Sequence, residues 1–65
     1  MNIEPVENAP ENLAAVLRSW RHHEELTLSE ASERVGLTID TYRRVEHGKP
    51  MDGKTLRQLL RWLLA

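Results

Sequence analysis

Two adjacent arginines, Arg43 and Arg44, are the residues of this 65-residue chain whose type and spacing suit the binding of paired hydrogen-bond acceptors. A guanidinium group presents a planar fork of N–H donors that matches paired acceptors on a phosphate, a carboxylate or the edge of a base. With Ile39 set at 0° on a helical projection, the arc from about 0° to 140° holds Asp40, Arg43, Arg44 and His47. The opposite arc, from about 200° to 300°, holds Thr41, Tyr42 and Val45. The segment therefore predicts a helix with a basic outer side, although a plain surface helix would show the same separation.

The residues in front of this helix predict a hinge. Thr27 and Glu30 have the spacing of a capping box, in which each side chain satisfies a backbone amide that the start of a helix leaves unpaired. Gly36 can adopt the positive φ that ends such a helix, and Thr38 is a good cap for the next one. Residues 27–47 therefore predict a helix-turn-helix, in which the second helix is built to enter the major groove of DNA.

The same stretch resembles the helix-turn-helix domains of the Cro and phage-repressor family. The matching segments are Leu26-Thr27, Gly36-Leu37-Thr38, Val45-Glu46-His47-Gly48-Lys49 and, in the first helix, Leu17-Arg18 with Arg21. The resemblance covers roughly residues 13–63. The chain departs from the family at Leu28, where a phosphate-binding Gln is usual, and at Ala31-Ser32, where Leu-Ala is usual. The resemblance implies an all-α, compact four-helix domain of the lambda-repressor-like type, with an ion pair between Arg21 and Glu46.

The remaining segments fit that architecture. Residues 1–8 predict a short acidic arm, and residues 9–65 predict the domain. Apolar stripes predict the inward sides of the first and last helices, at Leu13, Val16, Leu17 and Trp20 and at Leu56, Leu59, Leu60 and Leu63. Trp62 and Leu64 lie outside the second stripe. This surplus of apolar surface predicts a homodimer seam at Leu60, Trp62, Leu63 and Leu64, with a frayed tail as the alternative.

The outer arc and its surroundings give candidate DNA contacts. Arg44 is the first choice for reading a guanine, and Arg43 could read a base or grip a phosphate. Ile39 could pack on a thymine methyl group, and Asp40 could accept a hydrogen bond from a cytosine amino group. The candidate phosphate contacts are Thr38, Ser29, His47 and Lys49. His47 could instead cap the end of its helix.

Composition limits the alternatives. The net charge is −1, but residues 34–61 carry seven basic and three acidic side chains, which places a positive field around the predicted reading helix. The chain has no cysteine and no apolar run long enough to span a bilayer, so a cytoplasmic location without membrane attachment is expected. His22 and His23 lack the spacing of a zinc protease motif. We expect no enzymatic activity, no metal, no cofactor and no small-molecule ligand.

The sequence thus predicts a sequence-specific regulator that binds double-stranded DNA. Family analogy favours a small repressor or autorepressor of the kind used by phages and mobile elements. A homodimer would bind an inverted repeat whose half-sites lie about 34 Å apart. The alternative is a protein-interaction module, such as an antitoxin or adaptor, that uses the same fold.

Overall fold

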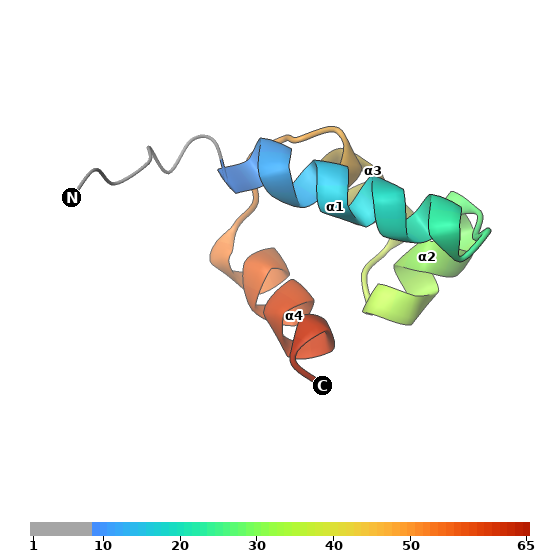
Figure 1. Ribbon diagram of the computed structural model, residues 1–65. Coiled ribbons are helices and arrows are strands. Elements are labelled where there is room, and N and C mark those ends of the chain that lie inside the picture. Colours follow the sequence, from blue (N-terminus) through green and yellow to red (C-terminus); the bar gives the residue numbers. More distant parts are fainter. Residues whose placement is uncertain (1–8) are drawn as a thin grey trace.

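The computed structural model describes residues 9–65, which form four α-helices and no strand (Figure 1). The helices are α1 (Ala9–His23), α2 (Leu28–Val35), α3 (Ile39–Glu46) and α4 (Gly53–Leu63). The predicted all-α, four-helix fold is confirmed. The predicted acidic arm, residues 1–8, lies outside the described residues. Within residues 9–65, no helix combines the length and apolarity that crossing a membrane requires.

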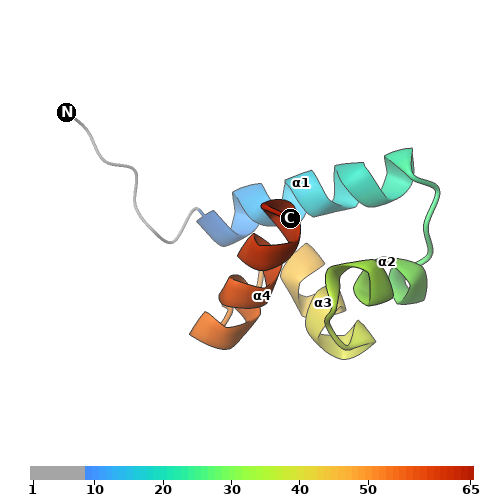
Figure 2. The ribbon, with the colours of Figure 1, turned by 90° about the horizontal axis from the view of Figure 1, so that it is seen from below.

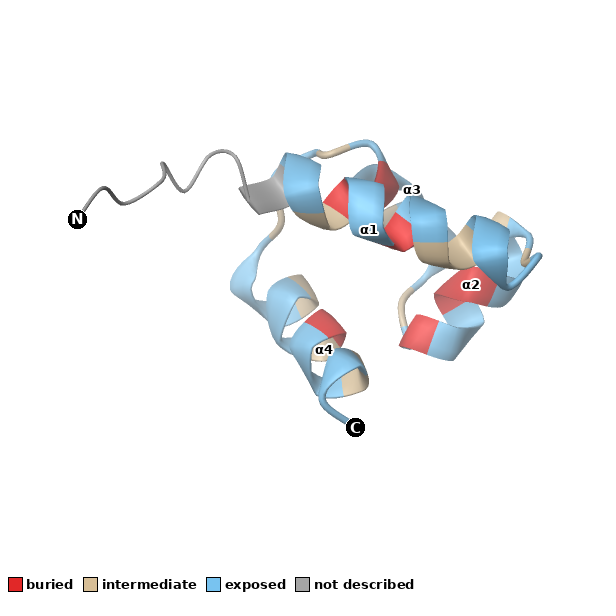
Figure 3. Ribbon diagram, in the orientation of Figure 1, coloured by how far each residue is buried: buried red, intermediate tan, exposed pale blue. Residues whose placement is uncertain are grey.

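The first three helices form a compact unit to which α4 is added. α3 packs against both α1 and α2, and α4 packs against α2. Figure 2 shows α2 and α3 together on the same side of α1. The core consists of Leu17, Ala31, Val35, Tyr42, Val45 and Leu59. Only one of these residues, Leu59, belongs to α4, and most of that helix is exposed in Figure 3.

The predicted helix starts are present. The hydroxyl of Thr27 accepts a hydrogen bond from the backbone N–H of Glu30 at 3.1 Å. The carboxylate of Glu30 accepts one from the backbone N–H of Thr27 at 2.9 Å, and this bond lowers the pKa of the Glu30 carboxyl. Thr38 caps α3 and Asp52 caps α4 through their side-chain oxygens. Local sequence alone therefore determines where three of the helices begin.

Each of the first three helices is followed by a residue with left-handed backbone. These residues are Glu25 with φ 56°, Gly36 with φ 88° and Gly48 with φ 74°. Gly36 suits its left-handed backbone, and a Cβ atom there would also lie 2.6 Å from the amide nitrogen of Gln58, so a side chain would have to displace that amide. Glu25 carries a side chain in a conformation that costs L-residues free energy.

The predicted inward side of the first helix is partly wrong. Val16 is 56% exposed, whereas Ala14 and Leu17 are buried. Leu13 and Trp20 do pack against the core, as predicted. The buried stripe is rotated toward Ala14 because a small side chain lets the crossing helix approach closely.

The predicted inward side of the last helix is also wrong, apart from Leu59. Leu56, Leu60 and Leu63 are between 42% and 48% exposed. The inward positions next to Leu59 are instead taken by Trp62 and Gln58. Trp62 meets Trp20 edge to face with ring centroids 4.7 Å apart, and Gln58 donates a hydrogen bond to the carbonyl of Val35. The large aromatic contact determines the rotation of α4. Trp62 is therefore part of the packed side and not of the free one.

Replacing Glu25 with glycine should stabilise the fold. We expect Glu25→Gly to raise the free energy of unfolding by about 1 kcal/mol, because glycine adopts the left-handed backbone without the clash of a Cβ atom. Urea unfolding measures the change. Glu24→Gly is the matched control, since Glu24 has a negative φ, and it should lower the stability instead. A loss of stability in both variants would contradict the strain at Glu25.

Candidate nucleic-acid interface

The two sides of α3 differ sharply in burial. Tyr42, Val45 and Glu46 are buried, with exposed fractions of 0%, 3% and 5%. Arg43 and Arg44 are exposed on the opposite side. The structure therefore places both predicted reading arginines in solvent, on a helix whose other side is fixed in the core.

The other predicted base-reading residues lie in the first turn of the same helix. Ile39 is 37% exposed, and the side chain of Asp40 is 85% exposed. The Asp40 carboxylate lies 3.6 Å from a terminal nitrogen of Arg43. The first two turns of α3 therefore present an apolar, an acidic and two basic side chains together.

The predicted phosphate contacts are spread over three places. Ser29 is exposed in the first turn of α2, and Lys49 is exposed just after α3. Thr38 is exposed, but its hydroxyl donates to the hydroxyl of Thr41 at 3.0 Å and accepts from the backbone N–H of the same residue at 3.3 Å. The Thr38 hydroxyl is thus already engaged in capping the helix.

His47 occupies the end of α3, on the side of α1. It caps the helix through its backbone N–H and lines a shallow hollow with Glu11, Ala14 and Arg18. The imidazole is exposed there. The structure thus separates His47 from the first turns of α3, where Ile39 and Asp40 lie.

An ion pair joins α1 to the end of α3. The Nε atom of Arg21 donates to Oε2 of Glu46 at 2.8 Å, and Nη2 donates to Oε1 at 3.1 Å. A third donor of Arg21 reaches the carbonyl of Leu26 at 3.3 Å. Burial, the largest single influence, raises the pKa of the Glu46 carboxyl, but the hydrogen bonds from Arg21, the neighbouring Tyr42 hydroxyl and the positive charges of Arg21 and Arg18 together hold that pKa below its usual value. The pair implied by the family resemblance is present, and it is bidentate.

Tyr42 completes the buried side of this cluster. Its ring is fully buried and its hydroxyl has no hydrogen-bond partner of regular geometry. A tyrosine hydroxyl is neutral at pH 7, and burial together with the neighbouring Glu46 carboxylate raises the pKa of the Tyr42 hydroxyl further. The Glu46 carboxylate therefore lies between the Arg21 guanidinium and the neutral Tyr42 hydroxyl.

Two residues that hold this region were not identified from the sequence as structural contacts. Arg18 donates a hydrogen bond to the backbone carbonyl of Glu46, at the end of α3. Gln58 donates from α4 to the carbonyl of Val35 at 2.9 Å, at the end of α2. Both side chains satisfy carbonyls that helix ends leave unpaired. Only the positions of Leu17-Arg18 within the family pattern pointed to Arg18, and no local pattern pointed to Gln58.

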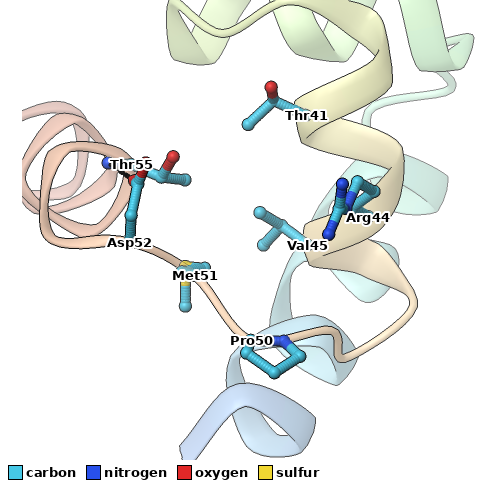
Figure 4. Close-up of a pocket in the computed structure, with 7 residues that line it drawn as sticks. All are labelled: Thr41, Arg44, Val45, Pro50, Met51, Asp52 and Thr55. Atoms are coloured by element: carbon cyan, nitrogen blue, oxygen red, sulfur yellow. Dashed lines mark hydrogen bonds between the residues drawn. The ribbon is translucent and has the colours of Figure 1, made fainter.

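A hollow of about 280 Å³ lies beside α3, between that helix and the loop that leads into α4. Figure 4 shows Thr41 and Val45 extending from α3 toward the hollow, with Met51 and Thr55 on its other side. Arg44, also on α3, is one of the residues that line this hollow. This flank of α3 is therefore not packed against another helix, and the Arg44 side chain has room to reorient.

Within residues 9–65 we find no group of three His, Cys, Asp or Glu side chains placed to hold a metal ion. His22 and His23 end α1, and both are exposed. The positive charge they can acquire is suited to the end of a helix.

Comparison with known proteins gives one finding. Residues 12–64 match the family model described as a helix-turn-helix domain. The match spans all of α2, α3 and α4 and most of α1. No curated protein and no solved structure gave a match.

The Arg21–Glu46 pair should be costly to break from one side. Arg21→Met leaves a buried carboxylate without its cation, and we expect it to lower the free energy of unfolding by about 3 kcal/mol. The double variant Arg21→Met/Glu46→Leu removes both charges and should recover most of that loss. Urea unfolding measures both.

Arg57→Met, at an exposed position of α4, is the control for loss of a surface arginine. It should change the stability by less than about 0.5 kcal/mol. Equal losses from Arg21→Met and Arg57→Met would contradict a structural role for the pair.

Proposed function

Because the chain belongs to the helix-turn-helix domain family, we propose that it is a sequence-specific regulator that binds double-stranded DNA through α3. The observation that carries the proposal is the exposure of Arg43 and Arg44 on a helix whose opposite side is buried. A helix of this kind fits the major groove, where base pairs differ in their donors and acceptors. Residues 9–65 would be the DNA-binding domain, and the Cro and phage-repressor type is the resemblance we favour.

Arg44 is the proposed reader of a guanine. Its guanidinium can donate two hydrogen bonds to O6 and N7, a pairing that discriminates against other bases by about 1–3 kcal/mol. The open flank next to Arg44 supports this role, because the side chain can adjust to a base without displacing packed neighbours. Ile39, in the first turn, would contact a thymine methyl group.

Phosphate contacts would hold the helix in register. Lys49 and Ser29 are exposed at the two places where strands of DNA would flank α3, and the free amides at the start of α2 add partial positive charge. His47 follows the last turn of α3, so it could bind only a phosphate that lies beside that end of the helix. Thr38 would contribute by keeping the first turn of α3 in shape, because its hydroxyl already serves as the cap.

The exposed side of α4 supports a homodimer. Leu60 and Leu63 are nearly half exposed, and Leu64 is 83% exposed. Leu56 extends the same surface, and we define these four residues as the leucine face. A two-fold axis through the leucine face would bury it against its own copy and would present two α3 helices to an inverted repeat with half-sites about 34 Å apart. Trp62, packed on Trp20, is not part of this seam.

A small repressor that controls its own synthesis is the biological role we propose. Such a protein would act by occupying an operator, so its cellular concentration would set the response. The second candidate is a protein-interaction module, and the exposed leucine face favours it as well. Selection from a random duplex library at low salt separates the two functions, since only a DNA reader enriches a sequence.

Arg44→Ala and Lys49→Ala should weaken DNA binding in different ways. Arg44→Ala should lower discrimination at one base position by about 1–3 kcal/mol. Lys49→Ala should weaken binding to all duplexes alike and reduce the salt dependence by about one phosphate contact. Titrations of an enriched duplex and its single-base variants at several salt concentrations measure both effects. Loss of the same base preference in both variants would contradict these roles.

Leu60→Gln should disrupt the homodimer. Leu60 is exposed in the single chain, so this change leaves the core intact but removes apolar surface from the leucine face. Sedimentation equilibrium should show a shift from dimer to monomer. Glu33→Gln, at an exposed position of α2, introduces the same residue and should leave the dimer intact. A wild-type chain that is monomeric at high concentration would exclude the dimer.

A further inference from the structure

The two arginines of α3 are held differently. The Asp40 carboxylate lies 3.6 Å from Nη1 of Arg43, one turn away on the same helix, and the two side chains are 85% and 49% exposed. The 3.6 Å separation is longer than a hydrogen bond, and no nitrogen of the Arg43 guanidinium donates a hydrogen bond within residues 9–65. Arg44 has no acidic partner within salt-bridge distance in the same range. Arg43 is thus attracted to a neighbouring carboxylate while all its donors stay free, and Arg44 has no such neighbour.

The attraction between Asp40 and Arg43 has a direction along α3. Asp40 lies toward the start of α3 and Arg43 lies three residues later, so the ion pair draws the guanidinium back toward the first turn. In helix-turn-helix proteins the first residues of the reading helix contact base edges. The carboxylate therefore aims Arg43 at the end of α3 that enters the groove most deeply.

An acidic side chain at this position lowers affinity for DNA, because it repels phosphates whatever the base sequence. Asp40 lies in the first turn of α3, where a negative charge also suits the helix dipole, so a role in recognition requires that it improve discrimination between duplexes. An arginine without an acidic neighbour can bind a phosphate, a base or solvent in many rotamers, whereas an arginine attracted to a neighbouring carboxylate has fewer favoured rotamers.

We propose that Asp40 is a positioning residue that orients Arg43 as a specificity-determining contact. This inference rests on the proposed function. It differs from a direct role of Asp40 in reading cytosine, because the effect of the carboxylate passes through Arg43. The ion pair is weak in the free protein, as exposed pairs are, and its effect is on base preference and not on folding.

A double-mutant cycle tests the proposal. Affinities for the enriched duplex and its single-base variants are measured for the wild type, Asp40→Asn, Arg43→Ala and the double variant. Asp40→Asn should reduce discrimination about fivefold at the position that Arg43→Ala also affects, and it should bind unrelated duplexes more tightly. In the Arg43→Ala background, Asp40→Asn should change discrimination no further.

Two control variants separate charge from orientation. Glu33→Gln removes one negative charge from α2 and should raise affinity for all duplexes without altering base preference. Asp40→Glu keeps the carboxylate and should retain more discrimination than Asp40→Asn.

The outcomes that overturn the inference differ from those that overturn the function. Unchanged discrimination in Asp40→Asn, or a loss that is equal in the Arg43→Ala background, would overturn the orienting role while leaving DNA binding in place. A wild-type chain that enriches no duplex at low salt would overturn the proposed function and this inference with it.

Discussion

The position of α3 depends on one interaction, the bidentate ion pair between Arg21 and Glu46. A glutamate at the end of a helix is unfavourable, because it faces the negative end of the helix dipole, and burial adds the cost of removing a charge from water. Arg21 compensates both costs only when its guanidinium meets the carboxylate in the observed geometry. Arrangements that shift α3 along α1 would leave a buried charge unpaired. The pair therefore selects one orientation of α3 against alternatives, more than it adds net stability.

The beginning of α3 is held by different means. Thr38 caps it, and the turn before it is fixed at Gly36, whose positive φ favours glycine. Gln58 reaches from α4 to the carbonyl of Val35 and so fastens the turn to the last helix. The helix that carries the arginines is thus fixed at both ends, by α1 at one and by α4 at the other. This is the rigidity that insertion into a groove requires.

Local chemistry was predictable from the sequence, and long-range packing was predictable only in part. The capping box at Thr27, the left-handed turn at Gly36 and the cap at Thr38 each depend on residues within a few positions, and all are present. The inward sides of α1 and α4 depend on contacts between distant segments. Leucines at helical spacing suggested one rotation of α4, but the pairing of Trp62 with Trp20 determined another. Hydrogen bonds from side chains to distant helix ends have no sequence signature, so Gln58 could not be identified beforehand.

The attachment of α4 links the proposed association to the proposed DNA binding. Within the described residues, α4 contributes one fully buried leucine, Leu59, together with Trp62 and the hydrogen bond of Gln58. A helix held by so few contacts would be ordered more firmly if a second copy covered its leucine face, as proposed. The same ordering would strengthen the contact of Gln58 with the turn that positions α3. Because linkage is reciprocal, DNA that favours a well-ordered α3 would then favour the proposed dimer by the same free energy. Under these proposals, DNA binding and association of the chain would reinforce each other.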